Sequence, residues 1–275
     1  MKQEACYKLA ALDMDGTLLN SRKKVSTKNR QAIQEAVSRG KTIVYATGRA
    51  VCEMEEYFEQ LPEIRYAIFA SGAGLYDIQE QRAFGLRPLP PEVAAVILEE
   101  AKARDIMPQI VLADCDAVQQ DQLDQLEKYW MGVYRPMYER AMTRVVDIHA
   151  FGAKHLDEIL KINLYHTNPE DRVLTLQELS GTQIEKVFSE RTSLECSAKG
   201  VNKGSGLEAL CSELGIEPAA CIAVGDAEND LPMMRVAGLG VAMGNAHQRV
   251  RKAADRIVAG NDENGCAEAI RLLFS

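Results

Sequence analysis

Two aspartates separated by one residue are the first feature of this sequence that suggests chemistry. The stretch KLAALDMDGTLLN begins as an apolar, strand-like run and then reaches Asp13 and Asp15, with Gly16 directly after them. In a strand, residues i and i+2 point to the same side. The sequence therefore predicts two adjacent carboxylates at the end of a buried strand. One can act as a nucleophile and the other as an acid and base, while Gly16 lets the chain turn away.

Further polar clusters follow the other expected strands of the chain. The runs KTIVYAT, YAIFAS and CIAVGD read as buried strands, and the helical stretches between them indicate a parallel sheet covered on both faces, an α/β fold. Ligands of such sheets bind beyond the carboxyl ends of the strands. We therefore expect these clusters to share one site with the two aspartates. They contain Thr47, Gly48 and Arg49, then Ser71 and Gly72, then Asp226, Glu228, Asn229 and Asp230.

The acids among these residues imply a cation, and the other groups suit a phosphate. Asp13, Asp15 and Asp226 would converge, and like charges at short range repel unless one is protonated or a cation is present. Oxygen-only ligands suit a hard ion, and Mg²⁺ suits a site that also binds phosphate. For the phosphate, Thr47 offers a hydroxyl and the loop after it offers N–H groups. Lys203 adds an ammonium at the start of an expected helix, whose dipole favours anions.

Other metal and nucleotide motifs fit the sequence less well. The four histidines are dispersed without an i, i+4 pair, so a zinc site is not expected. GKT at Gly40 to Thr42 lacks the first glycine of a Walker A motif, because Glu35 stands in its place. GLGVAMG lacks the dinucleotide-binding spacing, and GDAEND lacks the pattern of an EF-hand calcium loop. These segments are better interpreted as turns.

The ordered motifs carry a resemblance to a known family. The chain resembles the haloacid dehalogenase (HAD) superfamily phosphatases of the Cof-type subfamily, whose four motifs occur here in order as DMDGT, YATGR, KGVNKG and GDAENDLPMM. AGLGVAMGNA and NDENGCAEAI also look like the subfamily, whereas the middle of the chain resembles it less. The resemblance implies a Rossmann-like core with a parallel sheet, an inserted α+β cap domain, and a Mg²⁺-dependent phosphatase that acts through an aspartyl-phosphate.

The resemblance also implies roles for individual residues. Asp13 would be the nucleophile and Asp15 the general acid and base. Mg²⁺ would be held by the Asp13 side chain, the Asp15 carbonyl and Asp226, with Asp230 as a supporting acid. Asn229 would contact the phosphate or a neighbouring group. The other expected substrate- or phosphate-binding residues are Thr47, Gly48, Arg49, Lys203 and the pair Ser71-Gly72, which stands where the family often has Asn-Gly. Arg49 either contacts substrate or cap, or covers a helix.

The middle of the chain is organised differently from its ends. Between about Phe84 and Glu190, helices such as PPEVAAVILEEAKARD are mixed with strands such as KINLYH and TSLECS, which suggests an inserted α+β module. We therefore expect a catalytic core of residues 1–83 and 191–275 and a cap of residues 84–190. Trp130, with Tyr129 and Tyr134, lines either the core of this insert or a substrate pocket. We also expect the cap to select the substrate.

Composition restricts the partners and the location of the protein. Of its 275 residues, 47% are hydrophobic and 26% charged, as in ordinary globular proteins. A net charge of −8 argues against a nucleic-acid partner. The N-terminus lacks an apolar signal core, the apolar runs are shorter than a membrane span, and the seven cysteines form no C-x-x-C pair. We expect a cytoplasmic protein with reduced thiols and a small phosphorylated metabolite as ligand, without a membrane partner. The oligomeric state stays open.

Two classes of function remain open from the sequence. The first is a Mg²⁺-dependent phosphatase for small metabolites such as sugar phosphates. A close variant is a phosphotransferase or phosphomutase, in which a second hydroxyl replaces water. The second class is a non-catalytic protein that binds phosphorylated metabolites. Loss of Asp13, Asp15, Lys203 or Asp226 would favour the second class, and all four are present.

Overall fold

The computed structural model describes residues 7–274, and these residues form two compact units. The first unit contains the chain up to Gly48, Tyr57–Gly85 and the chain from Asn202 onward. The second contains Arg49–Glu56 and Leu86–Val201. The second unit is therefore inserted into the first at two places along the chain, as the short segment Arg49–Glu56 and the long segment Leu86–Val201.

The first unit is built on a parallel sheet. Among the described residues this sheet has eight strands in the order β14-β13-β12-β1-β2-β3-β4-β5, of which β14 to β3 pair in parallel and β4 and β5 are antiparallel. β1 lies at its centre and is fully buried, as expected for a strand covered on both faces. The strands are β1 (Leu9–Leu12), β2 (Thr42–Ala46), β3 (Tyr66–Phe69), β4 (Gly74–Asp77), β5 (Arg82–Phe84), β12 (Cys221–Gly225), β13 (Leu239–Ala242) and β14 (Arg256–Ile257).

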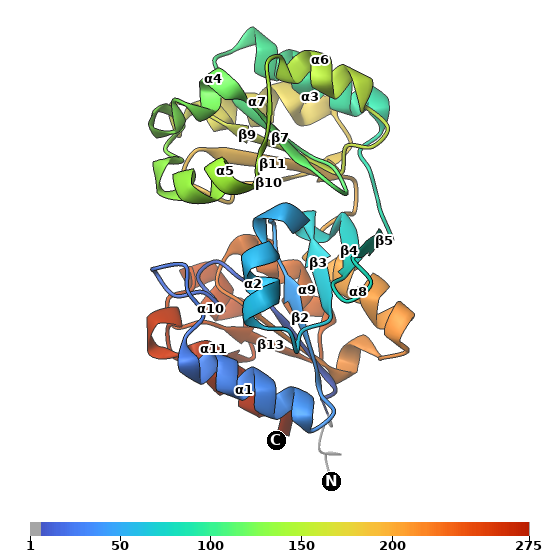
Figure 1. The fold of residues 1–275 in the computed structure, drawn as a ribbon, viewed down its shortest axis with the longest axis vertical. Helices are drawn as coiled ribbons and strands as arrows, with labels where there is room; N and C mark the ends of the chain where they lie inside the picture. Colours follow the sequence, from blue (N-terminus) through green and yellow to red (C-terminus); the bar gives the residue numbers. More distant parts are fainter. Residues whose placement is uncertain (1–6, 275) are drawn as a thin grey trace. The chain divides into compact units, whose positions relative to one another are not determined.

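The helices of the first unit are capped by local residues at their ends and pack against one another in pairs. Ser26 caps the first helix by accepting a hydrogen bond from the Asn29 N–H, and Gly215 ends α8 in the left-handed conformation. α1 packs against α11, and α8 packs against α9 (Figure 1). The helices are α1 (Thr27–Ser38), α2 (Glu55–Gln60, which the division between the units cuts), α8 (Lys203–Leu214), α9 (Leu231–Val236), α10 (Gln248–Ala253) and α11 (Gly265–Arg271).

The second unit has a mixed sheet with helices. Within the described chain its six strands follow the order β10-β11-β9-β6-β7-β8, and all pairs are antiparallel except β7 with β8. The strands are β6 (Met107–Val111), β7 (Asp116–Gln119), β8 (Thr143–Val145), β9 (Lys161–Tyr165), β10 (Ile184–Val187) and β11 (Ser193–Ala198). The helices are α3 (Pro91–Ala103), α4 (Gln120–Leu123), α5 (Arg135–Ala141), α6 (Ile148–Lys154) and α7 (Asp171–Glu178).

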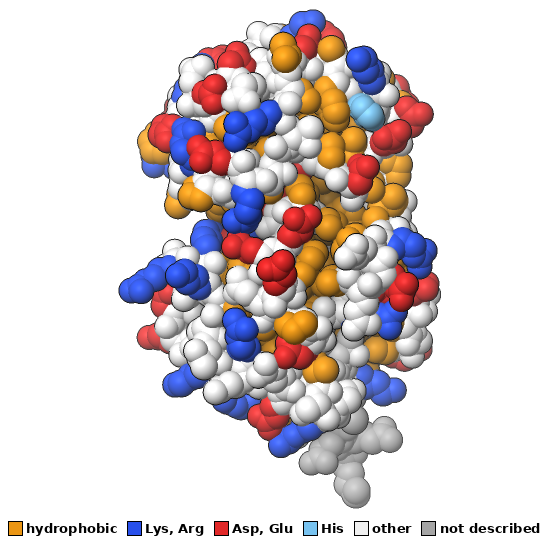
Figure 2. Space-filling model, viewed as in Figure 1, with side chains coloured by type: hydrophobic (Ala, Val, Ile, Leu, Met, Phe, Trp, Pro, Cys, Tyr) orange, Lys and Arg blue, Asp and Glu red, His pale blue; other side chains and the backbone are white. Residues whose placement is uncertain are grey.

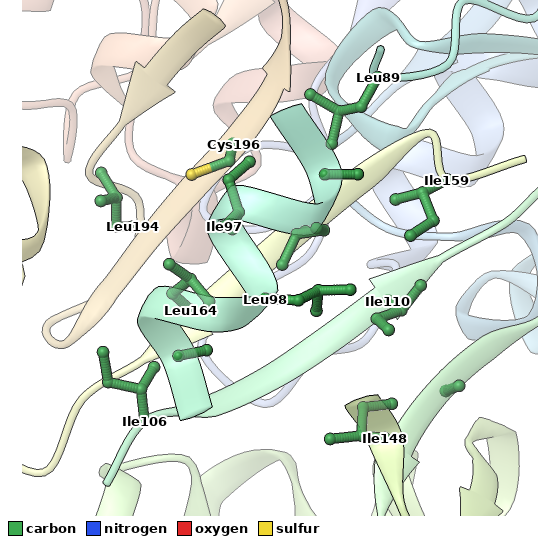
Figure 3. Packing of buried hydrophobic residues seen from close by; sticks show 14 of the residues in the cluster. Leu89, Ile97, Leu98, Ile106, Ile110, Ile148, Ile159, Leu164, Leu194 and Cys196 are labelled. Carbon is green, nitrogen blue, oxygen red and sulfur yellow. The ribbon is translucent and has the colours of Figure 1, made fainter. Parts of the chain in front are cut away.

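The two faces of this second sheet differ in chemistry, because successive side chains of a strand alternate between the faces. One face packs Ile110, Leu164 and Leu194 against Ile97 of α3 and Ile148 of α6 in an apolar cluster (Figure 3). The opposite face carries a smaller apolar cluster and, beside it, polar residues. The smaller cluster contains Met107, Val118, Leu123, Leu126, Tyr129, Met131, Tyr138, Met142 and Tyr165.

The structure confirms the expected α/β fold with an inserted α+β module. The expected cap of residues 84–190 differs in extent from the observed second unit, which runs on to Val201 because β11 pairs with β9 and β10. It also includes Arg49–Glu56, which the sequence assigns to the core. Of the aromatic residues in the insert, Tyr129 is buried, whereas Trp130 is 48% exposed and its indole N–H donates to the Thr167 carbonyl.

Three further expectations concern cysteines, membranes and charge. The six cysteines among residues 7–274 carry free thiols, while Cys6 lies outside the described residues. In the same range no helix has the length and apolar character needed to cross a membrane. Figure 2 shows acidic and basic side chains interspersed over the face in view, so that this face carries no continuous patch of one sign.

Candidate active site

Asp13 is placed by the central strands of the first unit. It directly follows β1, and its backbone N–H donates to the carbonyl of Val224 in β12 at 3.0 Å. The parallel pairing of β1 with β2 and β12 therefore fixes the backbone of this residue. Its side chain is only 9% exposed. A carboxylate held in this way is preorganised for a reaction at the end of the sheet.

Lys203 contacts Asp13 and a second carboxylate, Asp230, which lies far from Asp13 in the chain. Its Nζ lies 2.6 Å from Asp13 Oδ1 and 2.6 Å from Asp230 Oδ1. Lys203 is the first residue of α8, and the Asn202 side chain caps that helix by accepting the N–H groups of its first turn. Burial lowers the pKa of Lys203, but the two carboxylates outweigh this and hold it above its ordinary value. The lysine is therefore a fixed positive charge.

The loop after β12 supplies two carboxylates with different partners. Asp230 is fully engaged, because Oδ1 accepts from Lys203 while Oδ2 accepts the backbone N–H groups of Asp226 at 2.9 Å and Ala227 at 3.0 Å. Asp226 accepts a hydrogen bond from the Thr17 hydroxyl through Oδ1 at 3.2 Å. Asp230 thus shapes the loop, and Asp226 presents its carboxylate toward the end of β1.

Gly16 is required for this close approach. A Cβ at position 16 would lie 2.4 Å from Asp226 Oδ2, well inside contact distance. Its φ of +82° also lies in the region that residues with side chains rarely adopt. The glycine that follows the two aspartates in the sequence is therefore needed both for the turn and for the position of Asp226.

Three of these acids form a group that could hold a metal ion. Ligand oxygens of Asp13, Asp226 and Asp230 all lie within 4.8 Å of one another. Burial raises the pKa of Asp13 well above its ordinary value, with Lys203 opposing this and Asp230 and Asp226 adding to it. Burial and then Asp230 raise the pKa of Asp226 to about 6. One lysine does not neutralise three carboxylates, so an oxygen-coordinated divalent cation such as Mg²⁺ fits this donor set.

The loops after β2 and β3 meet the start of α8. The Ser71 N–H donates to the Thr47 carbonyl at 2.9 Å, and both side chains are buried. Ala70, Ser71 and Gly72 all have positive φ, which is unusual for two residues with side chains in succession and marks a constrained turn. A Cβ on Gly72 would lie 2.1 Å from the Asn202 carbonyl oxygen, so only glycine allows the helix start to pack here.

The structure places Asp15 outside the acid group. Its Oδ1 lies 2.7 Å from Lys23 Nζ, in an ion pair whose side chains are 28% and 35% exposed. Lys23 has a φ of 57° in a turn that Asn20 stabilises, and the Tyr57 hydroxyl donates to its backbone carbonyl. Lys23 was not predicted as a site residue, because a lysine in the run RKK has no distinguishing sequence signal.

The remaining predicted residues are Gly48, Arg49 and Asn229, and one residue that was not predicted, Asn245, contacts Gly16. Arg49 belongs to the second unit, where it donates to the Glu53 carbonyl at 3.1 Å, and Gly48 is the last residue of the first unit before it. The Asn229 side-chain oxygen is buried and accepts no hydrogen bond from the part of the chain that is described. Asn245 was also missed, although it lies in the family-like stretch AGLGVAMGNA. Its amide donates to the Gly16 carbonyl at 2.9 Å.

Comparison with known proteins agrees with this geometry. The family model of haloacid dehalogenase-like hydrolases matches residues 10–270. The chain is 31% identical to the 5-amino-6-(5-phospho-D-ribitylamino)uracil phosphatase YcsE of Bacillus subtilis, over 98% of this chain and 97% of that protein. It is 28% identical to an HMP-PP phosphatase of Serratia proteamaculans, over 87% of this chain and 85% of that protein.

A solved structure shows the same similarity in three dimensions. A haloacid dehalogenase-like hydrolase from B. subtilis superposes with a TM-score of 0.85 at 27% identity, over 96% of this chain and 99% of that one. The match extends through both units of the chain, and the relatives named above are phosphatases. The chain therefore belongs to the haloacid dehalogenase-like hydrolase family, as a Cof-type phosphatase of the phosphoric monoester hydrolase class.

Proposed function

We propose that this phosphatase is Mg²⁺-dependent and hydrolyses monoesters of small phosphorylated metabolites through a phosphorylated Asp13. The observation that carries the proposal is the buried contact of Lys203 with Asp13 beside Asp226. A carboxylate held at one oxygen by a fixed ammonium group has a defined orientation. Its other oxygen can then serve as the nucleophile.

In the first half of the reaction, an Asp13 oxygen attacks the phosphorus. A bond between this oxygen and phosphorus forms, and the bond between phosphorus and the ester oxygen breaks. Asp15 donates a proton to the departing alcohol. Thr47 and Ser71 supply hydroxyl donors for the phosphoryl oxygens, and the dipole of α8 favours an anion near its N-terminus. Lys203 offsets the charge that gathers at the phosphorylated carboxyl group.

In the second half, water releases the phosphate. Asp15, now a carboxylate, accepts a proton from a water molecule, whose oxygen bonds to phosphorus while the bond to Asp13 breaks. Inorganic phosphate and free Asp13 result, and Asp15 is again protonated for the next cycle. Separate positions suit these two carboxyl groups to their different tasks, since Asp13 is buried against Lys203 whereas Asp15 is partly exposed.

The acids of the site would hold the metal. The Asp13 and Asp226 carboxylates and the Asp15 carbonyl are the proposed ligands, with Asp230 as a supporting acid. Bound there, Mg²⁺ would neutralise the carboxylates and the phosphoryl oxygens. Asp230 contributes mainly by orienting Lys203 and the N–H groups of the loop after β12, because both of its oxygens are already engaged.

The substrate is proposed at the level of its class. The named relatives act on a ribitylaminouracil phosphate and on HMP-PP, which are small phosphorylated metabolites. We propose a substrate of that general kind, with the inserted unit selecting among phosphate esters. A sugar phosphate is one member of the class. A cytoplasmic location, and the lack of nucleic-acid and membrane partners, stay predictions from the sequence.

A screen of purified protein tests this proposal. We expect hydrolysis of p-nitrophenyl phosphate and of at least one sugar, polyol or coenzyme phosphate in the presence of Mg²⁺. EDTA should abolish the activity and added Mg²⁺ should restore it. Asp13→Asn should fold and lose nearly all turnover, because the amide is close in shape but a poor nucleophile. Full activity of the chelated enzyme, or of Asp13→Asn, would contradict the proposal.

A further inference from the structure

The loop that follows β1 and Asp15 carries groups of the proposed site at both of its ends. We call residues 16–21 the β1 loop. At its start, the Asp15 carbonyl is a proposed metal ligand, and the Thr17 hydroxyl donates to Asp226 Oδ1 at 3.2 Å. Just beyond its end, Lys23 pairs with the Asp15 carboxylate. The conformation of the β1 loop therefore decides where the carbonyl and the carboxylate of Asp15 lie.

The β1 loop is folded into turns. The N–H groups of Thr17, Leu18 and Leu19 donate to carbonyls of the chain just after β1, at distances of 2.8–3.3 Å. These bonds use N–H groups of the loop, so its carbonyls must find other partners. Gly16, at the start of the loop, has more conformational freedom than any other residue type. The peptide groups beside it therefore need restraint from outside the loop.

Two asparagines from the C-terminal part of the chain supply this restraint. Asn245 Nδ2 donates to the Gly16 carbonyl at 2.9 Å, and Asn261 Nδ2 donates to the Leu19 carbonyl at 3.0 Å. Asn245 Oδ1 also accepts the backbone N–H of Asn261 at 2.9 Å. The two asparagines are therefore bonded to each other as well as to the loop.

The partners of Asn245 determine which way its amide faces. The Gly16 carbonyl can only accept and the Asn261 N–H can only donate, so the amide nitrogen faces the first and the oxygen the second. A further bond joins the same two segments, because Asp262 Oδ1 accepts the Ser21 N–H at 2.9 Å. We call Asn245, Asn261 and Asp262 the C-terminal clamp.

The clamp differs from a buried asparagine that makes a similar connection. Asn29, which is 1% exposed, donates to the Leu18 carbonyl at 3.1 Å and accepts the Ala267 N–H at 3.0 Å. Asn245 is exposed. At an exposed position water can replace a lost hydrogen-bond partner, so the bond adds little to overall stability. The contact of Asn245 with the loop therefore contributes mainly orientation.

Asn245 acts on the peptide group that leads to Thr17. The Gly16 carbonyl and the Thr17 N–H belong to one planar peptide group. Asn245 donates to its carbonyl, and its N–H donates to the Met14 carbonyl at 3.3 Å. With both ends held, the direction of the chain at Thr17 is fixed. The Thr17 hydroxyl that contacts Asp226 is thereby fixed as well.

We propose that Asn245 and Asn261 are positioning residues for the phosphatase reaction. They hold the β1 loop so that the Asp15 carbonyl and the Asp226 carboxylate present their oxygens to one cation. The clamp gives a role to the stretches AGLGVAMGNA and NDENGCAEAI, which contain these asparagines and to which the proposed function assigns none. The inference rests on the proposed function, because it concerns the groups that would hold Mg²⁺.

Hydrogen exchange of the metal-free protein is the first test. Asn245→Ala removes the donor to the Gly16 carbonyl, so the amides of Thr17, Leu18 and Leu19 should exchange about tenfold faster, as followed by NMR. Exchange in β12 and α8 should stay unchanged. Gln248→Ala removes an exposed amide at the start of α10 and is the matched control. It should leave all of these rates as in the wild type.

Metal binding and turnover then distinguish positioning from support of the fold. Calorimetry should give a Mg²⁺ dissociation constant about three- to tenfold higher for Asn245→Ala than for the wild type. At saturating Mg²⁺, kcat for p-nitrophenyl phosphate should fall about tenfold while KM changes by less than about twofold, because the reacting groups are misplaced but the phosphate donors remain.

Asn261→Ala is the second variant. It removes the donor to the Leu19 carbonyl and keeps the backbone N–H that Asn245 accepts. It should therefore change the loop exchange, the Mg²⁺ affinity and kcat in the same direction as Asn245→Ala, but by less. Changes in the opposite direction would contradict a shared role of the two asparagines.

The outcomes separate this inference from the proposed function. Faster exchange of the loop with unchanged Mg²⁺ affinity and kcat would show that the clamp is only structural, so the inference would be wrong while the phosphatase mechanism stands. Unchanged exchange, or equal acceleration in the loop, β12 and α8, would also overturn it. If the wild type neither binds Mg²⁺ nor hydrolyses p-nitrophenyl phosphate, the proposed function itself fails, and the inference with it.

Discussion

Without the proposed Mg²⁺, the stability of the first unit should depend on pH through Asp226. Burial and the neighbouring Asp230 raise the pKa of this carboxyl from 3.8 to about 6 in the folded protein without metal. A carboxyl group with a raised folded pKa binds its proton more tightly in the native state. Its contribution to stability is therefore fully present below about pH 4 and is lost as the pH rises through about 6.

The size of the effect follows from the two pKa values. The difference between 3.8 and about 6, at about 1.36 kcal/mol per pKa unit, corresponds to a loss of about 3 kcal/mol in the free energy of unfolding. Asp226→Asn cannot ionise and keeps an oxygen that can accept from the Thr17 hydroxyl. The stability of the wild type relative to this variant should therefore fall by about 2 kcal/mol between pH 4 and pH 6, and by about 3 kcal/mol in all between about pH 3 and pH 7.

The assay must follow the first unit alone. Trp130 lies in the second unit, so its fluorescence does not report on the core. Amide hydrogen exchange of peptides from β1 and β12 measures the opening free energy where the site is built. Metal-free wild type and Asp226→Asn are compared across the pH range. Asp262→Asn, an exposed aspartate of the same unit, is the control for loss of a carboxylate.

Two results would refute this reasoning. Parallel pH dependence of wild type and Asp226→Asn would mean that the Asp226 carboxyl is not destabilised in the metal-free fold. An unchanged difference between the two proteins in saturating Mg²⁺ would mean that the cation does not neutralise this carboxylate. We expect instead that Mg²⁺ stabilises the wild type progressively more as the pH rises, because the metal binds the ionised form.

Three further substitutions have defined outcomes. Lys203→Met leaves buried carboxylates without their cation, so hydrogen exchange should show the core destabilised by about 3–5 kcal/mol. Gly16→Ala forces a side chain against Asp226 at positive φ; it should cost at least about 1–2 kcal/mol and weaken Mg²⁺ binding in calorimetry. Lys23→Met removes a partly exposed ion pair with Asp15, so stability should change by at most about 1 kcal/mol. The kcat of Lys23→Met should nevertheless fall more for alkyl phosphates than for aryl phosphates, because aryl leaving groups need no proton from Asp15. Equal losses of kcat for both kinds of ester would contradict a role of Lys23 in positioning Asp15.

Much of the arrangement around Asp13 could be predicted because it depends on strand ends. Asp13 and Lys203 are 190 positions apart in the chain, yet both lie where the parallel sheet gathers its functional loops. The motif order therefore indicates a shared site before any contact is known. The apolar runs of β1, β2, β3 and β12 are equally clear in the sequence, since buried parallel strands leave little freedom for other residues.

Other features depend on tertiary contacts that leave no local pattern. The ion pair between Lys23 and Asp15 forms because a turn stabilised by Asn20 brings the chain back toward Asp15. The sequence does not show which of the neighbouring basic residues pairs with Asp15. Assignment of Arg49–Glu56 to the second unit is equally invisible, because it rests on contacts such as that of Glu53 with Gln109. The polar residues Gln109, Asp116 and Asn163 of the second sheet are a third case, since alternation predicts which face of the sheet they share but not that they are buried.

The phosphorylation of Asp13 tests the central claim most directly. Enzyme mixed with p-nitrophenyl phosphate and Mg²⁺ is quenched in acid within one turnover, and the protein is reduced with borohydride, which converts an acyl phosphate of aspartate into homoserine. Peptide mass spectrometry then locates the modified residue. The mechanism predicts homoserine at position 13, absent without substrate and absent in Asp13→Asn. Turnover with no modification at position 13, or with modification at another carboxylate, would contradict it.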